Sequence, residues 1–322
     1  MSALGLLLLS LCATAGVSLG VALLMAATTR LWLPRVEALP AERRAWGLLV
    51  ASGAPLLAGL GFTALCFAPK ALSLAGDHCT THGGDHAHFC FSHLPDSAGS
   101  PLAWLVVLTL VAVVGARAAS SLLGALRARR SVALLLSGAR EDADVHVVPT
   151  TTPIALSTGL LRRRVVISSA LVADLPAPLL AAVIAHERAH NRRRDVLRAF
   201  VASLLATAHL PALRRRLLSS LDLAAELASD AEAAAAVGDR LIVARALLAV
   251  ERLALATPAH AALGAPLGGS AVPRRVEALL SPEPAARRTP SWLLAPLLLA
   301  AALLADPLHH AAETLFGFIA GM

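Results

Sequence analysis

The stretch VIAHERAHNRRRD, residues 183–195, decides the fold class of this chain. His186 and His190 stand four residues apart, and Glu187 directly follows the first histidine. On a helix this spacing puts both imidazoles on one face, one turn apart, which suits two ligands of one tetrahedral zinc ion. The stretch matches the H-E-x-x-H zinc pattern, in which the glutamate can reach a zinc-bound water. The alternative is a surface helix with two solvated histidines.

A second motif favours the zinc interpretation. The sequence LAAELASDAEA, residues 223–233, predicts a helix on which Glu226 and Asp230 share one face. Catalytic zinc takes three protein ligands and keeps one position open for water, so Glu226 can complete the set. Asp230 can accept a hydrogen bond from a ligand histidine and fix its tautomer. The alternative is an acidic solvated helix face, because Asp222 and Glu232 flank these residues.

The composition indicates a membrane protein. Hydrophobic residues make up 57% of the 322 residues, charged residues only 15%, and the mean hydropathy is +0.70. Soluble domains carry roughly 45–50% apolar and about 25% charged residues. Three segments of suitable length and apolarity predict membrane-spanning helices, and a shorter segment predicts a fourth span before a short tail within 290–322. The four predicted spans are residues 3–28, 45–69, 102–126 and 291–305.

The arginines predict how the chain is oriented. They are concentrated after the first predicted span, after the third and before the fourth, and the positive-inside rule places these regions in the cytoplasm. Residues 29–44 and 127–289 are then inside, whereas 71–101 and both termini are outside. A cleaved signal peptide is the alternative for the N-terminus, but the basic n-region is missing and the apolar run is too long. We expect an integral protein of a bacterial-type inner or plasma membrane, with the lipid bilayer as a partner.

Residues 127–289 predict a small cytoplasmic α+β domain in an otherwise mainly α chain. The apolar runs 144–148 and 164–169 read as strands of a hairpin or sheet edge, and residues 150–160 read as turns. Residues 165–168 could form an edge to which an extended substrate adds, or a plain structural strand. Residues 179–194 read as the zinc helix, and residues 199–213 as a buried or membrane-surface helix, too short for two spans.

Two smaller expectations concern polar groups in this domain. A further donor to the tetrahedral oxyanion is expected, and because the chain has no tyrosine, His209 or an arginine are the available guesses. The arginines at 192–194 either lie near the anionic inner leaflet or pair with acidic residues. Direct nucleic-acid binding is not expected, because no basic stripe is interleaved with aromatic residues.

At this point the sequence resembles the gluzincin pattern of integral-membrane metallopeptidases. It looks most like the BlaR/MecR-type family, because VIAHERAHNRRRD is followed by ELASD and preceded by PTTTPIALSTGLLRRRVVISSALVADLPAPLLAAVIAHE. The order of three spans before the zinc domain and one span after it also resembles that family. Members of that family that sense antibiotics carry an extracellular penicillin-binding domain, and no S-x-x-K motif is present here. The related HtpX-type proteases share the zinc pattern, but they usually place spanning helices between the zinc helix and the third ligand.

The resemblance implies a zinc endopeptidase that cleaves itself or a cytoplasmic protein such as a transcriptional repressor. It implies one Zn²⁺ ion held by His186, His190 and Glu226, with Glu187 as the general base and Asp230 as the partner of a ligand histidine. Two other interpretations stay open. One is a housekeeping quality-control protease of the HtpX type, and the other is a non-catalytic metal-sensing membrane protein.

The predicted extracellular loop carries a further cluster of histidines and cysteines. In GDHCTTHGGDHAHFCFSH, residues 76–93, the two cysteines could form a disulfide, because the loop is expected to face outward. The same residues could instead bind zinc or copper ions, or have no collective role. The residues concerned are His78, Cys79, His82, His86, His88 and Cys90.

Overall fold

The computed structural model describes residues 3–72, 89, 98–256, 271–281 and 311–319. Helices make up most of these residues, and four short strands form one sheet. The predicted fourth span at 291–305 lies outside the described residues. So do the six residues of the histidine- and cysteine-rich loop, which are His78, Cys79, His82, His86, His88 and Cys90.

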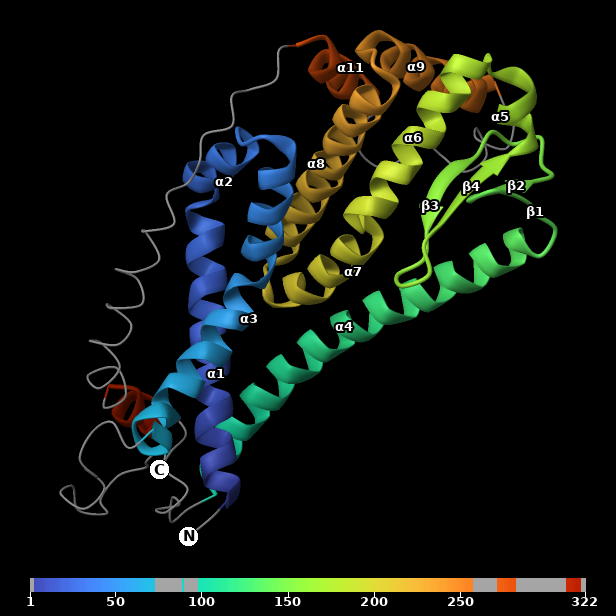
Figure 1. Cartoon of the computed structure of the whole chain (residues 1–322). Helices are drawn as coiled ribbons and strands as arrows, with labels where there is room; N and C mark the ends of the chain where they lie inside the picture. Colours follow the sequence, from blue (N-terminus) through green and yellow to red (C-terminus); the bar gives the residue numbers. More distant parts are fainter. Residues whose placement is uncertain (1–2, 73–88, 90–97, 257–270, 282–310, 320–322) are drawn as a thin grey trace.

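Three helices are long and apolar enough to cross a membrane, and they coincide with the first three predicted spans. They are α1 (Ala3–Ala27), α3 (Ala41–Leu72) and α4 (Pro101–Leu136). Figure 1 shows α1 and α3 side by side, with the short α2 (Thr29–Glu37) between them in sequence. Helix α4 starts beside α1 and runs obliquely to the sheet (Figure 1). It continues without a break past the predicted end of the third span at residue 126.

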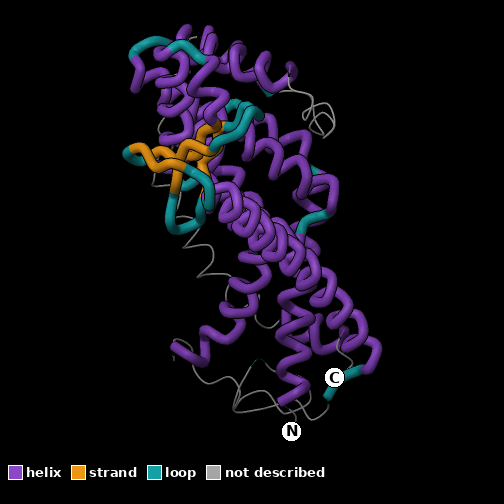
Figure 2. Tube along the Cα trace, turned by 90° about the vertical axis from the view of Figure 1, so that its right-hand side faces the viewer, coloured by secondary structure: helices purple, strands orange, loops and turns teal. Residues whose placement is uncertain are grey.

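The sheet has the strand order β1-β2-β4-β3 and lies at the end of the molecule away from the two termini (Figure 2). Strands β2 and β4 are the two apolar runs that the sequence predicted, but they pair in parallel with each other and do not form a hairpin. The antiparallel hairpins are made by β1 with β2 and by β3 with β4. The strands are β1 (Arg140–Asp142), β2 (Val145–Val148), β3 (Ala155–Thr158) and β4 (Arg164–Ser168).

The prediction that residues 165–168 form a sheet edge is wrong. Strand β4 is paired on both sides, and Val165 to Ser168 are buried, so it is a structural strand. The edge strands are β1 and β3, and β3 lies within residues 150–160, where the sequence suggested only turns. Its four residues are all half-buried and carry no alternation of apolar and polar side chains that would reveal a strand. The turn after it needs Gly159, which has φ +93° and lies too close to the Arg162 carbonyl for a Cβ atom.

The zinc-motif helix is α6 (Ala177–Arg193), close to the predicted range 179–194. It ends at Arg194, which adopts the left-handed conformation with φ 57° and lets the chain change direction into α7 (Asp195–Leu205). The single helix expected over 199–213 is wrong, because a 3₁₀ turn, η2 (Ala206–Ala208), separates α7 from the next helix. Further helices are α5 (Ser169–Asp174), α8 (Pro211–Val237), α9 (Arg240–Ala256) and α11 (Val272–Leu280), and residues 311–319 are also helical.

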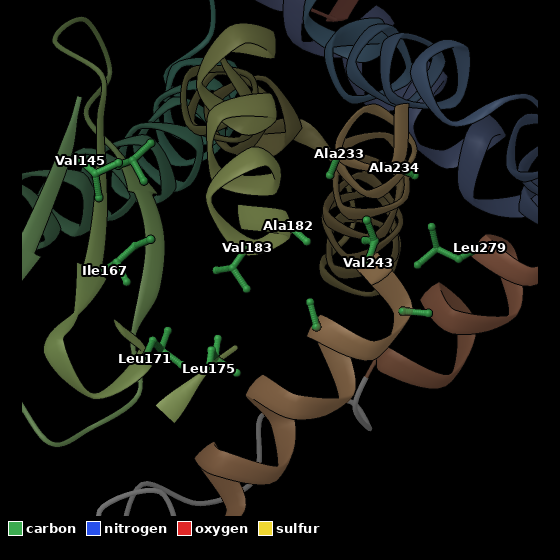
Figure 3. Close-up of a cluster of buried hydrophobic side chains, with 13 residues drawn as sticks. Val145, Ile167, Leu171, Leu175, Ala182, Val183, Ala233, Ala234, Val243 and Leu279 are labelled. Atoms are coloured by element: carbon green, nitrogen blue, oxygen red, sulfur yellow. The ribbon is translucent and has the colours of Figure 1, made fainter. Parts of the chain in front are cut away.

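Two apolar clusters stabilise this part of the molecule, and the first of them includes the zinc-motif helix. In the first, Val183 on α6 packs with residues of the sheet, α8, α9 and α11, among them Ile167 and Val243 (Figure 3). In the second, Leu48 of α3 packs with Leu217 and Leu221 of α8, which joins the candidate spans to the domain. Helix α8 therefore lies between α6 and α3, and the C-terminal end of the zinc-motif helix comes close to the first turn of α3.

Candidate metal centre

Three potential ligands converge where α8 packs against α6. His186 and His190 lie on one face of α6, and their Nε2 atoms are 3.0 Å apart. Glu226 of α8 brings one carboxylate oxygen to 3.4 Å from His186 Nε2 and the other to 3.6 Å from His190 Nε2. The structure thus brings together the three residues that the sequence proposed as ligands, with one ligand atom of each within 4.8 Å of the others.

The carboxylates behind the two histidines orient their rings. Nδ1 of His190 lies 2.9 Å from Oδ2 of Asp195, a hydrogen bond in which the ring donates. Nδ1 of His186 lies 2.9 Å from Oδ1 of Asp230, within ion-pair distance although the contact departs from the direction of a straight hydrogen bond. With their protons on Nδ1, both rings turn the lone pair of Nε2 toward the same point.

This donor set fits a zinc ion. Two neutral rings at 3.0 Å would turn their Nε2 lone pairs against each other, and either a proton on His186 or a metal cation between the rings relieves this repulsion. Ligands of a tetrahedral zinc ion at about 2.0–2.1 Å are about 3.3 Å from one another, close to the separations seen among His186, His190 and Glu226. Nitrogen and carboxylate ligands with a carboxylate behind each histidine are typical of catalytic zinc.

Glu187 lies beside the ligands and is 7% exposed. Its position on α6, directly after the first histidine, turns it to the cavity that the ligands line. Burial raises the pKa of its carboxyl group and outweighs the attraction of His186 and His190. A carboxylate with a raised pKa is better able to take up and hold a proton near neutral pH, as a general base requires.

Arg275 of α11 is a member of the site that the zinc motifs did not reveal. One guanidinium nitrogen lies 2.8 Å from Glu226, and two others lie 2.7 Å from the two oxygens of Asp230. A nitrogen of Arg275 is also 3.4 Å from His186 Nε2. The only signal in the sequence is that Arg274 and Arg275 stand together in a short amphipathic segment, which does not say which of them faces the site.

The additional oxyanion donor stays a prediction, for which the sequence offered His209 or an arginine. Arg275 places an arginine beside the potential ligands, whereas His209 does not line the cavity. Nε2 of His209 instead lies 3.0 Å from the carbonyl oxygen of Ala51 in α3, and the side chain is fully buried there. His209 therefore has a structural role at the contact between η2 and α3.

Burial and the neighbouring charges act in opposite directions on the site's ionisable groups. Burial by itself would lower the pKa of His186, but the carboxylates of Asp230 and Glu226 outweigh it and raise the pKa to about 9. Burial would raise the pKa of Asp230, but Arg275 and His186 hold it below the ordinary value. The metal-free site is thus a compact set of mutually neutralising charges.

The metal centre opens into a cavity of about 770 Å³. Its wall includes the edge strand β3 on one side and apolar residues of α8 and α9 on the other, among them Leu221, Leu247 and Val250. Among the residues that the structure describes, no strand pairs with the outer edge of β3, so this edge can add an extended peptide by backbone hydrogen bonds. The cavity is large enough for several side chains, and it is mostly apolar.

Two further features of the quoted motif became clear only in the structure. Asp195 closes the motif and contacts His190, and Ser229 of α8 lies 3.1 Å from the same ring nitrogen. Arg192 pairs with Glu232, and Arg193 pairs with Glu42 and Asp195, so the expectation that arginines of this run pair with acids is confirmed for these two. Asp195 is a residue type that can orient a histidine, but its contact with His190 depends on the turn at Arg194, which the sequence did not reveal.

The three converging side chains are a donor set that could hold a metal ion. Residues 130–258 match the family model described as Peptidase family M48, so this stretch is a Peptidase M48 family domain. The match includes both histidines, Glu187 and Glu226, and implies a metallopeptidase, because M48 peptidases are typically metal-dependent. Helix α11 and most of the candidate spans lie outside the matched residues. No curated protein and no solved structure matches the chain.

Proposed function

We propose that the protein is a membrane-embedded zinc-dependent endopeptidase that hydrolyses peptide bonds of a cytoplasmic or membrane protein, with a role in signal transduction. The observation that carries the proposal is the convergence of His186, His190 and Glu226, with Glu187 buried beside them in an open cavity. The M48 match supports the peptidase class. Three helices long and apolar enough to span a membrane support the attachment to the bilayer.

The residues divide the chemistry among themselves. His186, His190 and Glu226 would hold the zinc ion, which when bound polarises the scissile carbonyl and lowers the pKa of a water molecule. A carboxylate oxygen of Glu187 takes the proton of the attacking water and later delivers it to the leaving amine nitrogen. Asp195 and Asp230 keep the two histidine rings in the tautomer that ligation needs.

The substrate is expected to lie along β3. Because Ser168 N–H donates to the carbonyl of Ile154, antiparallel alternation turns the backbone groups of Leu156 toward β4 and those of Ala155 and Ser157 toward the open edge. These outward groups lie in the wall of the cavity that holds the metal centre. A peptide chain paired to this edge would cross the site in an extended conformation, which leaves its carbonyl groups accessible.

The signalling role rests on the resemblance to the BlaR/MecR-type family and on the position of the site. Ion pairs link the zinc-motif helix α6 directly to the first turn of candidate span α3. The positive-inside rule predicts that this end of the spans is cytoplasmic. A stimulus on the far side would then act on helices that touch the peptidase domain.

The test is the Glu187→Gln variant of the full chain. We expect it to bind zinc with nearly unchanged affinity and to lose cleavage, because the amide keeps the shape of the side chain but cannot accept the proton. Cleavage is followed by comparing newly formed peptide termini in cells that carry either form. Glu232→Gln is the control, since it makes the same change to a glutamate that does not line the cavity. Proteolysis that survives Glu187→Gln would leave a non-catalytic metal-sensing protein as the better interpretation.

A quality-control protease of the HtpX type is the second candidate, and one observation favours it. The turn η2 lies between the zinc-motif helix and Glu226, and it packs against α1, α3 and α4. The segment between the potential ligands therefore contacts the candidate spans. A signalling peptidase should produce new termini in one or a few proteins. A quality-control protease should produce them in many damaged membrane proteins, which the same comparison of peptide termini distinguishes.

A further inference from the structure

A chain of charged side chains connects the first turn of candidate span α3 with a histidine of the metal centre. Glu42 of α3 pairs with Arg193 at the end of α6 and, at 2.9 Å, with Arg198 of α7. Nε of Arg193 lies 3.1 Å from Oδ2 of Asp195, and Arg198 lies 3.6 Å from Oδ1. Asp195 in turn holds Nδ1 of His190 at 2.9 Å. The links connect α3 with α6 and α7.

The inner part of this chain is well shielded. The side chains of Arg193, Arg198 and Asp195 are 11%, 18% and 7% exposed, whereas Glu42 is 45% exposed. Charges in such surroundings interact more strongly than on an open surface, and their positions are mutually fixed. A change in the charge or position of Glu42 would therefore affect Asp195 through the two arginines, with little screening by solvent.

The two acids share the arginines. Oδ2 of Asp195 accepts from His190 and also from Arg193, and Oδ1 makes no hydrogen bond within the described residues. By pairing with both arginines, Glu42 limits how strongly they compete with His190 for the Asp195 carboxylate. Without Glu42 the carboxylate would be drawn toward the guanidinium groups, and the surroundings of the site would carry one more net positive charge. Both effects weaken cation binding.

The outer part of the chain lies where α3 is expected to leave the bilayer. Trp46, one turn into α3, donates its indole N–H to Glu42 at 3.0 Å. The Arg198 guanidinium carbon lies 4.8 Å from the centre of the Trp46 ring, a cation–π contact. Trp46 is 51% exposed, and tryptophan is enriched at membrane–water interfaces. The position of α3 is thus fixed to the zinc-motif helix at the expected membrane surface.

We propose that Glu42 is a positioning residue for the metal centre: through Arg193 and Arg198 it sets the Asp195 carboxylate and thereby the ring of His190. The span α3 is then coupled to metal affinity and geometry, so a displacement of its first turn changes the site. This proposal rests on the zinc site of the proposed function. It assigns to a residue outside the M48 match an effect on a ligand inside it.

The experiment measures metal binding by the full chain in detergent micelles or nanodiscs. Zinc affinity is obtained by competition with a chelator, and Co²⁺ serves as a probe whose d–d absorption reports ligand geometry. We expect Glu42→Gln to weaken zinc binding about threefold to tenfold and to change the Co²⁺ spectrum. Direct removal of the partner in Asp195→Asn should cost about 10–100-fold. Glu42→Asp, which keeps the charge, should recover most of the affinity and the spectrum.

Glu232→Gln is the matched control, because Glu232 holds the neighbouring Arg192 but has no link to Asp195. It should leave the affinity and the spectrum unchanged. If Glu42 only fastened α3 to the domain, Glu42→Gln would lower the melting temperature while zinc affinity and the Co²⁺ spectrum stayed as in the wild type, and the proposal would be wrong. Failure of the wild type to bind either metal would instead overturn the zinc site of the proposed function.

Discussion

Arg275 and Asp230 form a two-point ion pair across α11 and α8, with Nε and one terminal nitrogen each 2.7 Å from a carboxylate oxygen. The Asp230 side chain is 1% exposed and that of Arg275 is 12% exposed, so the pair is buried. The same guanidinium reaches Glu226 at 2.8 Å. The site therefore depends on Arg275 to help neutralise two carboxylates that otherwise face only histidine side chains.

The first prediction concerns Arg275→Ala. Breaking a buried ion pair by removing one partner costs about 3–5 kcal/mol, because the remaining charge is left without compensation. We expect a marked fall in the melting temperature of the metal-free protein and a smaller fall with zinc bound, since the ion supplies positive charge beside Glu226. Thermal melts with and without zinc check this. Arg274→Ala is the control, because Arg274 is exposed; equal losses in the two variants would contradict the role given to Arg275.

The second prediction concerns Asp230→Asn. The amide keeps the size of the side chain but loses the charge that orients His186 and attracts the cation, so zinc affinity should fall about 10–100-fold. Chelator competition measures the change. Asp222→Asn provides the comparison, since Asp222 lies one turn from Glu226 on the same helix and has no ion pair within the described residues. Similar losses of zinc affinity in both variants would mean that Asp230 acts only through its negative charge and has no role in orienting His186.

The sequence predicted the ligands because their chemistry follows from helical periodicity. His186, His190 and Glu226 needed only the four-residue spacing and a second helix. Arg275 and Glu42 could not be found in this way, because both reach the site from elements distant in the chain. Their contacts depend on how α11 and α3 pack against α8, which no local pattern encodes.

The strands also divide into features that a local sequence pattern predicts and features that depend on tertiary packing. Residues 145–148 and 164–168 were recognisable because β-branched residues dominate them, but their parallel pairing depends on tertiary packing. Strand β3 was missed because its half-buried side chains lie against α6 and the cavity and show no alternation. The strand that lines the cavity, β3, was thus the one that the sequence did not predict.

The third prediction concerns pH and His186. In the metal-free protein its pKa is about 9, above the ordinary value of 6.5, because the carboxylates of Asp230 and Glu226 outweigh the effect of burial. The stabilisation from the protonated ring is complete below about pH 6.5 and is lost as the pH rises through about 9. Zinc binding needs the neutral ring, so affinity should rise over the same window, by at most about tenfold per pH unit for one released proton.

Two measurements check the pH prediction. Melting of the metal-free protein should show decreasing stability from about pH 6.5 to 9, and chelator competition should show increasing zinc affinity over this range. Asp230→Asn removes one of the carboxylates that raise the pKa and should move the upper end of the window to lower pH. Zinc affinity that does not vary between pH 7 and 9 would mean that His186 is already neutral, contrary to the geometry around it.

The fourth prediction tests β3 as the substrate-binding edge. Backbone groups of Ser157 point to the open edge, whereas those of Thr158 point to β4, by the alternation that the bond from Ser168 to Ile154 establishes. Ser157→Pro removes an outward N–H and leaves the pairing with β4 intact. We expect cleavage of a protein substrate to fall at least about tenfold, as expected from the loss of one well-placed backbone hydrogen bond in a largely desolvated cavity.

Thr158→Pro is the counterpart that separates substrate binding from folding. It removes an N–H on the β4 side, so it should lower the melting temperature by weakening the β3–β4 ladder. Ser157→Pro should keep both the melting temperature and the zinc affinity near those of the wild type, because neither the ladder nor the ligands change. Full cleavage by a folded, zinc-binding Ser157→Pro variant would show that the substrate does not pair with β3 through this residue. The position of the cavity beside β3 would then have to be explained by substrate side chains alone.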